Sequence, residues 1–421
     1  MDHNRIEIGD NIGFSTIIDK KFKSSLLTVR FITSLDKQTS SDNVMAFSLL
    51  SDTNSRYRTI AGLSEALSEL YGSSISSFSR KRGDLQILGI SSTWLASRYA
   101  IYGEDIQKGM LEIFHDCLFS PDAENGAFNS ETFAIEKKEL LDRIDAELNS
   151  KRRFAVAKGT ALAFSGEPAE NYSYGTKETA EAVTSESAYS AYRRILETAR
   201  IEAFFVSSEP DPNVEKMLRD GFASVKRRPE PVRFISYSPL KPEPVTVTEE
   251  FDVRQCKMVM AFKTDSEDAF ALRLMATILG VTPVSKLFVN VREKLGLCYY
   301  CSCQIMLTKG TLFIDCGVER DNIEKARQEI MRQIDEMCSG NITDDEISSA
   351  VLATENGLCQ VGDTISSYSG WYFERLCENS IQSPQEMEKV YRGVTKERIV
   401  EAAKTLKLDS VYIMLDKEDK E

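Results

Sequence analysis

The two halves of this chain carry the same order of sequence patterns, and this duplication is the feature that most limits how the chain can fold. The segment VTSESAYSAYRRI (183–195) is matched by VTKERIVEAAKTL (394–406), and in each the threonine is placed to cap a helix. An apolar strand pattern follows each segment, IEAFFVSS (201–208) and SVYIMLD (410–416). A repeat of about 200 residues indicates a duplicated domain rather than a solenoid.

Upstream of these segments, hydrophobic periodicity predicts the same five elements in each half. They are, in order, an apolar strand, a helix, a glycine-containing turn, a second strand and a long amphipathic helix. The first half has them at 26–32, 43–53, 69–74, 83–91 and 106–119. The second half has them at 256–262, 267–280, 294–300, 310–318 and 322–337. The expected fold class is therefore α/β (α+β), with two similar domains.

A proline-rich segment separates the two halves. Gly221–Pro244 holds five of the eleven prolines, and this polar, proline-rich composition is typical of a linker. We therefore predict an N-terminal domain at 1–220, a linker at 221–245 and a C-terminal domain at 246–421. A chain of 421 residues is also too long for one ordinary hydrophobic core.

The charge balance excludes one class of partner. The net charge is −13, which repels phosphate backbones and argues against nucleic acid. The local basic run SRKRG (Ser79–Gly83) is interpreted as a solvated turn. The N-terminal sequence lacks a signal-peptide pattern, and the most apolar later window, Ala269–Val281, is too short for a membrane span. We therefore expect a soluble, cytoplasmic protein.

Histidine gives little support for a zinc site. The chain has two histidines, His3 and His115. His3 lies in a terminus that we expect to be frayed, and His115 has no second histidine within a helical turn. Neither belongs to an H-E-x-x-H or H-x-x-E-H motif, which places two imidazoles on one helical face. Both are therefore interpreted as surface or helix-packing residues.

Cysteine offers a second route to a metal. Cys298, Cys301 and Cys303 have the spacing of half a thiolate site, but the sequence contains no second C-x-x-C. Cys301 and Cys303 would share one face of a strand, where a free cysteine acts as a small hydrophobic residue. A thiol-based redox or metal sensor stays open as an alternative.

Other catalytic signatures are missing from the sequence. It has no G-x-S-x-G elbow, no G-x-x-x-x-G-K-[ST] phosphate loop and no G-x-G-x-x-G turn. The carboxylates of Glu136–Glu147 follow amphipathic helix spacing, which is typical of a solvated face. No motif in the chain indicates autonomous catalysis.

The segment SKLFVNVREKLGLCYY (285–300) resembles the L-F-x-x-x-R-E-x-x-G-L-x-Y element of the M16 metallopeptidases, the family of insulinase, pitrilysin and the mitochondrial processing peptidase. The segments 131–144 and 170–192 are also similar to this family. The resemblance covers nearly the whole chain. It implies two M16-like domains, each a mostly antiparallel sheet covered by helices, which the proline-rich linker joins into a clamshell.

The chain departs from the family at the zinc site. Active M16 members carry H-x-x-E-H on the helix that corresponds to 43–53, and a distal glutamate ligand further along. In this chain the corresponding positions are Met45, Ser48, Leu49, and Asp142 or Arg143. Apolar and hydroxyl side chains cannot replace two imidazoles and a general-base carboxylate. The resemblance therefore implies that this chain binds no zinc cofactor and hydrolyses no peptide alone.

The resemblance also implies a role. Several M16 enzymes are heterodimers in which one subunit carries zinc and the other contributes an arginine, a tyrosine and part of the chamber wall. That arginine and tyrosine fall on Arg292 and Tyr299, which would bind an extended peptide substrate at the zinc of an H-x-x-E-H partner. Segments 34–44 and 69–77 are similar to a bacterial inactive peptidase-like protein linked to elongation-factor-P modification genes.

Two alternatives stay open. At the level of residues, Arg292 could pair with a neighbouring acid while Tyr299 packs on the core as an ordinary strand residue. At the level of the protein, a homo-oligomeric peptide-binding or scaffold protein could keep the chamber without proteolysis.

Overall fold

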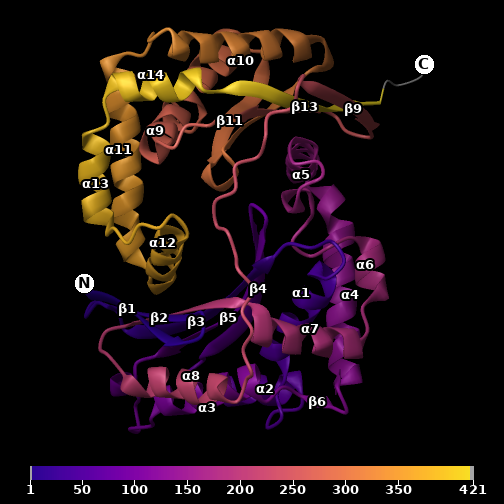
Figure 1. Ribbon diagram of the computed structural model, residues 1–421, viewed down its shortest axis with the longest axis vertical. Helices are drawn as coiled ribbons and strands as arrows, with labels where there is room; N and C mark the ends of the chain where they lie inside the picture. The colour runs from indigo at the N-terminus through magenta and orange to yellow at the C-terminus, as the bar shows by residue number, and fades with distance from the viewer. Residues whose placement is uncertain (1, 418–421) are drawn as a thin grey trace. The chain divides into compact units, whose positions relative to one another are not determined.

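The computed structural model describes residues 2–417, apart from the side chain at position 148, and these residues form two compact units. Unit 1 contains the residues up to Asp145, together with Asn171–Phe234 and Gly362–Asn379. Unit 2 contains Ala146–Glu170, Ile235–Val361 and the residues from Ser380 onward. Each unit therefore combines segments from both halves of the sequence (Figure 1).

A six-stranded mixed sheet forms the centre of unit 1, with the strand order β1-β2-β8-β3-β5-β4. Strands β2 and β8 are parallel, and the other neighbouring strands are antiparallel. Its strands are β1 (Asp2–Gly9), β2 (Ile12–Ile18), β3 (Ser24–Ser34), β4 (Ser74–Arg82), β5 (Leu85–Leu95) and β8 (Arg200–Ser207). A separate small hairpin is formed by β6 (Ala123–Glu124) and β7 (Ala127–Phe128).

Helices lie on both faces of this sheet. In Figure 1, α3 and α8 lie on one side of the strands and α12 on the other. The helices of unit 1 are α1 (Ser40–Asp52), α2 (Ile60–Glu69), α3 (Ile106–Phe119), α4 (Ser130–Ala146), α6 (Lys177–Ala182), α7 (Ser185–Thr198), α8 (Pro212–Ala223) and α12 (Ile365–Cys377). Helix α12 packs on β3 and β8.

The alternation of side chains along β3 explains the two faces. Leu27, Val29 and Phe31 are buried in the large hydrophobic core that the helices complete. Thr28 and Arg30 lie on the opposite face, where Arg30 donates a hydrogen bond to Ser369 of α12. One face is therefore apolar, and the other carries charged and hydroxyl groups.

Unit 2 is built on a five-stranded sheet with the order β11-β12-β10-β13-β9. Strands β13 and β9 are parallel, and the other neighbours are antiparallel. The strands are β9 (Val245–Phe251), β10 (Cys256–Lys263), β11 (Cys298–Met306), β12 (Thr311–Val318) and β13 (Lys407–Asp416). The order reproduces β4-β5-β3-β8-β2 of unit 1, including the position of the parallel pair. This match supports the duplication that the sequence pattern indicates.

Helices also lie on both sides of the second sheet. Figure 1 shows α10 and α14 on one side of β13 and α5 on the other. The helices of unit 2 are α5 (Lys151–Ala163), α9 (Ala269–Gly280), a π-helix (Leu287–Lys294), α10 (Ile323–Cys338), α11 (Asp344–Gln360), α13 (Pro384–Arg392) and α14 (Lys396–Lys404). Short 3-10 turns are found at 97–99, 147–149, 168–170, 307–309, 320–322 and 361–363.

Helices α5 and α12 occupy equivalent places in the two units. Helix α5 packs on β10 and β13, and α12 packs on the corresponding strands β3 and β8. Each helix comes from the half of the sequence opposite to the sheet that it covers. The predicted domains at 1–220 and 246–421 follow the sequence repeat. The compact units differ from them because α5, from the first half, belongs to unit 2 and α12, from the second half, belongs to unit 1.

The strands and helices predicted for both halves are present, and the predicted mixed α/β fold class is confirmed. The predicted linker begins too early, because Gly221 and Phe222 belong to α8 and Phe222 is buried. His3 is not frayed but lies in β1, where its ring stacks 3.9 Å from that of Tyr372.

The basic run Ser79–Gly83 is also not a solvated turn. Its first four residues form the end of β4, and Lys81 and Arg82 are partly buried. Only Gly83 and Asp84 make the turn into β5. The sequence did not reveal this because basic residues are typical of edge strands as well as of turns.

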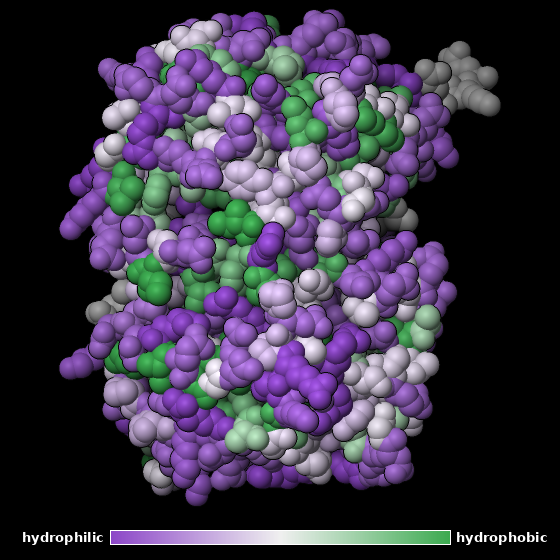
Figure 2. All heavy atoms as spheres, in the orientation of Figure 1, coloured by the Kyte–Doolittle hydropathy of each residue, from purple (hydrophilic) through white to green (hydrophobic). Residues whose placement is uncertain are grey.

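Within residues 2–417, no helix is long and apolar enough to cross a membrane. On the face that Figure 2 shows, hydrophilic residues cover most of the surface and apolar ones form small groups. Scattered apolar side chains of this kind are normal for a protein surface.

Substitution of Gly159 tests the packing of α5 on its sheet. A Cβ atom at Gly159 would lie 2.6 Å from Cγ1 of Val259 in β10, so Gly159→Ala forces the helix and the strand apart. We expect the free energy of unfolding to fall by about 1–3 kcal/mol in urea denaturation.

Gly357→Ala in α11 is the matched control. No atom lies within 4 Å of a Cβ built at Gly357, so only the helix propensity changes there. This variant is expected to gain about 0.5–1 kcal/mol. Equal effects of the two substitutions would show that α5 does not pack closely on β10.

Candidate functional site

The segment that the sequence singles out, 285–300, consists of the π-helix, a tight turn and the start of β11. Gly296 has a φ of 60°, in the left-handed region that glycine adopts without strain. Its amide donates to the carbonyl of Arg292, and the next amide, of Leu297, donates to that of Val291, each at 3.0 Å. π-Helices are rare and are often found at functional sites.

Tyr299 occupies a β-bulge. Cys298 is opposite Val318 and Tyr300 is opposite Gly317, so Tyr299 is an extra residue between two register positions. A bulge changes the direction of a side chain, and that of Tyr299 is 63% exposed. A hydrogen bond with Glu319 raises the pKa of the Tyr299 hydroxyl. Tyr299 is therefore not packed on the core as the residue-level alternative expected, whereas Arg292 does pair with a neighbouring acid, Glu293.

Arg292 lies at the other end of the segment. Its guanidinium group is 4.6 Å from the ring centre of Phe288, and Nε is 3.5 Å from a carboxylate oxygen of Glu293. The side chain is 40% exposed, and an exposed pair of this kind contributes little to stability. Arg292 and Tyr299 thus have different neighbours, and both are accessible from solvent.

The tyrosine beside Tyr299 is one that sequence reasoning missed. The ring of Tyr300 lies 4.3 Å from the guanidinium of Arg152 in α5 and 5.6 Å from Nζ of Lys257. Arg152 also forms a bidentate ion pair with Asp315, at 2.6 and 3.2 Å. No sequence signal connects residue 152 with residue 300, because the contact arises from the exchanged helix.

The cysteines of the segment form a buried thiol group. Cys301 lies opposite Cys316 in the β11–β12 register, and Cys298 interacts with Cys301 through a side-chain hydrogen bond. That bond lowers the pKa of Cys298 and raises that of Cys301. Cys303 donates to the carbonyl of Ala276 at 3.0 Å, and burial raises its pKa. Cys301 and Cys303 are thus packed residues of the strand, whereas the lowered pKa of Cys298 keeps the thiol-sensor alternative open.

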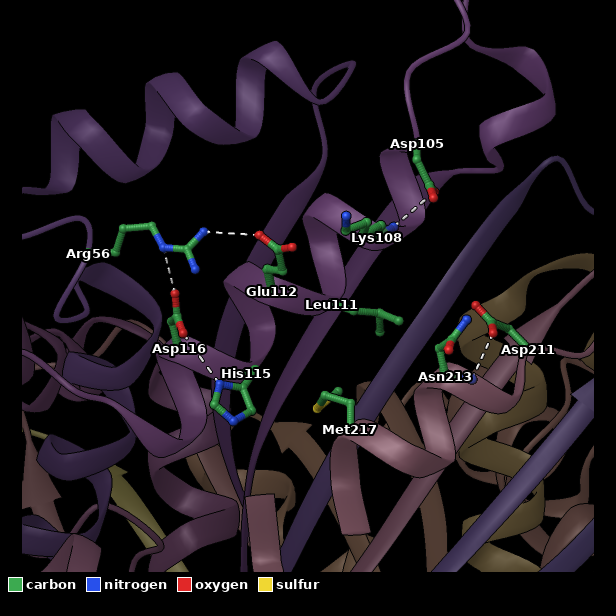
Figure 3. A pocket seen from close by; sticks show the side chains of 10 residues that line it. All are labelled: Arg56, Asp105, Lys108, Leu111, Glu112, His115, Asp116, Asp211, Asn213 and Met217. Atoms are coloured by element: carbon green, nitrogen blue, oxygen red, sulfur yellow. Dashed lines mark hydrogen bonds and ion pairs between the residues drawn. The ribbon is translucent and has the colours of Figure 1, made fainter. Parts of the chain in front are cut away.

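His115 lines a cavity of about 420 Å³ between α3 and α8 (Figure 3). Its Nδ1 atom is 3.3 Å from Asp116, whose carboxylate also pairs with Arg56 at 2.9 Å. Arg56 in turn donates to Glu112 at 3.2 Å. These charges satisfy one another, and the nearby thiol of Cys117 is buried with a raised pKa. The cavity therefore lacks an activated nucleophile.

The positions that correspond to a zinc site are dispersed. Met45 and Leu49 are buried in the hydrophobic core of unit 1, and Ser48 is partly buried on the same helix, α1. Asp142 and Arg143 are exposed on α4. Over residues 2–417, no group of three or more His, Cys, Asp or Glu side chains is arranged to hold a metal. The residues present do not fit a catalytic zinc ion.

Comparison with known proteins gives a consistent result. Residues 182–353 match the family model described as the peptidase M16 inactive domain. The chain is 26% identical over 400 residues to "Probable inactive metalloprotease YmfF" of Bacillus subtilis (strain 168), covering 94% of this chain and 93% of that protein. By sequence and fold, the chain is thus similar to non-catalytic proteins of the M16 peptidase family.

Solved structures share the M16-like fold along the whole chain. A conserved protein from Enterococcus faecalis V583 superimposes with a TM-score of 0.92 at 23% identity and covers 100% of both chains. The peptidase M16 inactive domain from Pseudomonas fluorescens has a TM-score of 0.81 at 15% identity, over 99% of this chain and 98% of that one.

Helices α1 and α4 correspond to the helices that carry the zinc ligands in active M16 peptidases. In this chain they bring a group of carboxyl side chains together instead. Asp52 at the end of α1 shares a hydrogen bond with Glu136 of α4, and Glu139 of α4 is also near. Burial, followed by these carboxylates, raises the pKa of Asp52 to about 8. The two carboxyl groups therefore share a proton at neutral pH, because two adjacent charges would repel each other.

Asp52→Asn tests this shared proton. Because the pKa of Asp52 is higher in the folded than in the unfolded state, its stabilising effect is complete below pH 4 and is lost as the pH rises to about 8. The variant does not titrate, so it should become more stable than the wild type as the pH rises. We expect a difference of up to about 5 kcal/mol at pH 8 and almost none at pH 4, measured by urea unfolding.

Asp142→Asn on the same helix is the control, because this residue is exposed. Its effect on stability should be small and should not change with pH. A pH-independent effect of Asp52→Asn would contradict the shared proton.

Proposed function

We propose that the chain is the non-catalytic, zinc-free subunit of a two-subunit M16-type peptidase. In this proposal the partner carries the H-x-x-E-H motif and the zinc ion, and this chain contributes Arg292 and Tyr299 to the binding of an extended peptide. The observation that carries the proposal is the contrast between two sites. The positions of the zinc ligands are packed into the core or dispersed, while the arginine and tyrosine of the M16 motif remain exposed.

The local structure supports a binding role for this pair. A tyrosine that serves only the fold would be buried, but the bulge turns Tyr299 outward. The guanidinium of Arg292 packs against the ring of Phe288, which restricts the side chain. Arg292 therefore loses less conformational entropy when a peptide binds. A guanidinium can donate to peptide carbonyl groups, and a tyrosine hydroxyl adds one donor beside a flat apolar surface.

Co-expression tests the proposal directly. The chain is produced alone and together with an H-x-x-E-H M16 protein, and zinc content, assembly and peptide cleavage are measured. We expect a stable complex with zinc and activity, and neither property in the isolated chain. Stoichiometric zinc in the isolated chain would contradict the proposal. A stable self-dimer that binds peptides and ignores the partner would favour the scaffold alternative instead.

Two substitutions test the assigned residues within the complex. We expect Tyr299→Phe to lower kcat/KM by about tenfold, because one hydroxyl donor is lost. Arg292→Ala should lower it by about 10- to 100-fold, because a charged donor is lost. Both variants should still assemble, as size-exclusion chromatography would show.

Tyr102→Phe and Arg233→Ala are matched controls, since both residues are exposed and lie in unit 1. They should leave turnover unchanged. If the controls and the test variants behaved alike, Arg292 and Tyr299 would have no specific role in the reaction.

A further inference from the structure

A second polar surface lies in unit 1, far in sequence from Arg292 and Tyr299. It is a cavity of about 460 Å³ on the sheet face opposite the large core, lined by β3, β4, β5 and α12. Its volume is within the range of small-ligand pockets. Part of its lining is the basic run that the sequence suggested to be a solvated turn.

The cavity has an excess of positive charge. Arg30, Arg80, Lys81 and Arg82 line it, and Glu374 of α12 is the acidic residue among its lining side chains. Glu374 pairs with Arg82 and so compensates one of the four cations. This excess stands out in a chain with a net charge of −13. Like charges that are gathered at one partly buried site repel one another, so a cluster of them is most readily explained by an anionic ligand.

Two hydrogen-bond donors of the cluster have no acceptor. Nη1 of Arg30 and Nε of Arg82 are enclosed, and neither has a hydrogen-bond partner within the described part of the chain. More than nine-tenths of buried polar groups in folded proteins are satisfied. Several other buried side-chain atoms of the described residues also lack a partner, but these two belong to guanidinium groups that line the same cavity, where an anion could accept from both.

The donors are held in place. The guanidinium of Arg30 lies between the rings of Phe204 and Phe373, 4.8 Å from each ring centre. Its Nη2 atom donates to Oγ of Ser369 at 2.9 Å, which leaves Nη1 as the remaining terminal group. Arg82 is fixed in turn by its ion pair with Glu374. Such restraint is what a binding site needs, because little freedom is lost when the ligand arrives.

The remaining lining suits a side chain rather than an isolated inorganic ion. Leu26, Phe78, Ile87 and Phe373 supply apolar surface, and Ser76, Ser91, Ser366 and Ser369 supply hydroxyl groups. A guanidinium binds a carboxylate through two nearly parallel hydrogen bonds. Apolar walls around such donors fit the methylene groups of an acidic residue.

We propose that this cavity binds the carboxylate of an acidic peptide, with Arg30, Arg80 and Arg82 as its recognition residues. The proposal rests on the proposed function, because it names the class of peptide that the subunit would select: one with aspartate or glutamate. It is tested on the chain alone, so its outcome does not depend on a zinc-containing partner.

The experiment compares two fluorescein-labelled, Gly/Ser-rich peptides that differ only in having several glutamates or glutamines at the same positions. Fluorescence anisotropy with the isolated chain should show at least about tenfold tighter binding of the glutamate peptide at low salt. The preference should decrease as salt screens the charges. Equal affinities for the two peptides would overturn the proposal.

Three variants locate the binding. Arg30→Lys keeps the charge and removes Nη1, and Arg82→Gln removes the second unsatisfied donor. Arg80→Gln changes an exposed residue and leaves the fold intact, so it remains informative if the other two variants are unstable. Each should weaken binding of the glutamate peptide by about 5- to 50-fold. Arg233→Gln, at an exposed position elsewhere in unit 1, is the control and should have no effect.

Inorganic phosphate distinguishes the type of anion. We expect it to displace the glutamate peptide weakly. Tight phosphate binding without peptide binding would overturn the assignment to a peptide carboxylate. If the two-subunit complex cleaved peptides but the isolated chain showed no preference for glutamate, the proposed function would stand and this inference would fail. A preference for glutamate without assembly would support this inference, and the proposed function would fail.

Discussion

The packing of α5 and α12 on the second faces of the two sheets is the interaction on which the rest of the structure depends. The central strands of both sheets are mostly buried on both faces, so each sheet must be covered on both sides. In unit 2 the residues Ala155, Ala163 and Phe164 from the α5 region form a core with Val259 and Phe313 of the sheet. Since α5 belongs to the first half of the sequence and α12 to the second, neither half completes its own unit. The two copies therefore depend on each other to fold.

These second faces differ in chemistry from the faces covered by the larger sets of helices. Beside the apolar contacts of α5, Lys263 donates to the carbonyl of Ala163 at 3.1 Å, and burial lowers the pKa of its amine to about 8. Lys309 pairs with Glu167 at 2.6 Å, close to the end of the same helix. Under α12, Arg30 is enclosed by two phenylalanine rings. Charged groups on these faces are thus held in fixed positions, which is the condition under which they can recognise a ligand.

The burial of Met45 and Leu49 and the exposure of Tyr299 follow from where each residue lies in the fold. Helix α1 faces the large core, so replacing metal ligands by Met45 and Leu49 adds apolar packing and removes the cost of buried imidazoles. Tyr299 gains no such apolar packing, because it lies in a bulge of the edge strand β11. Apolar packing therefore stabilises α1, while Arg292 and Tyr299 stay accessible from solvent.

The sequence alone determined the duplication, the fold class, the elements of each repeat and the absence of zinc-ligand motifs, because hydrophobic periodicity and motif spacing are local properties. It also selected Arg292 and Tyr299, although only the register of β11 and β12 shows that a bulge exposes Tyr299. The tertiary structure alone decided which helix covers which sheet, since α5 and α12 carry no signal of the strands on which they pack. It also decided the place of Arg30 on β3 and of Lys81 and Arg82 on β4, two strands that flank β5 and line one cavity. Their charges are visible in the sequence, but their proximity depends on strand pairing between residues that are far apart in the chain.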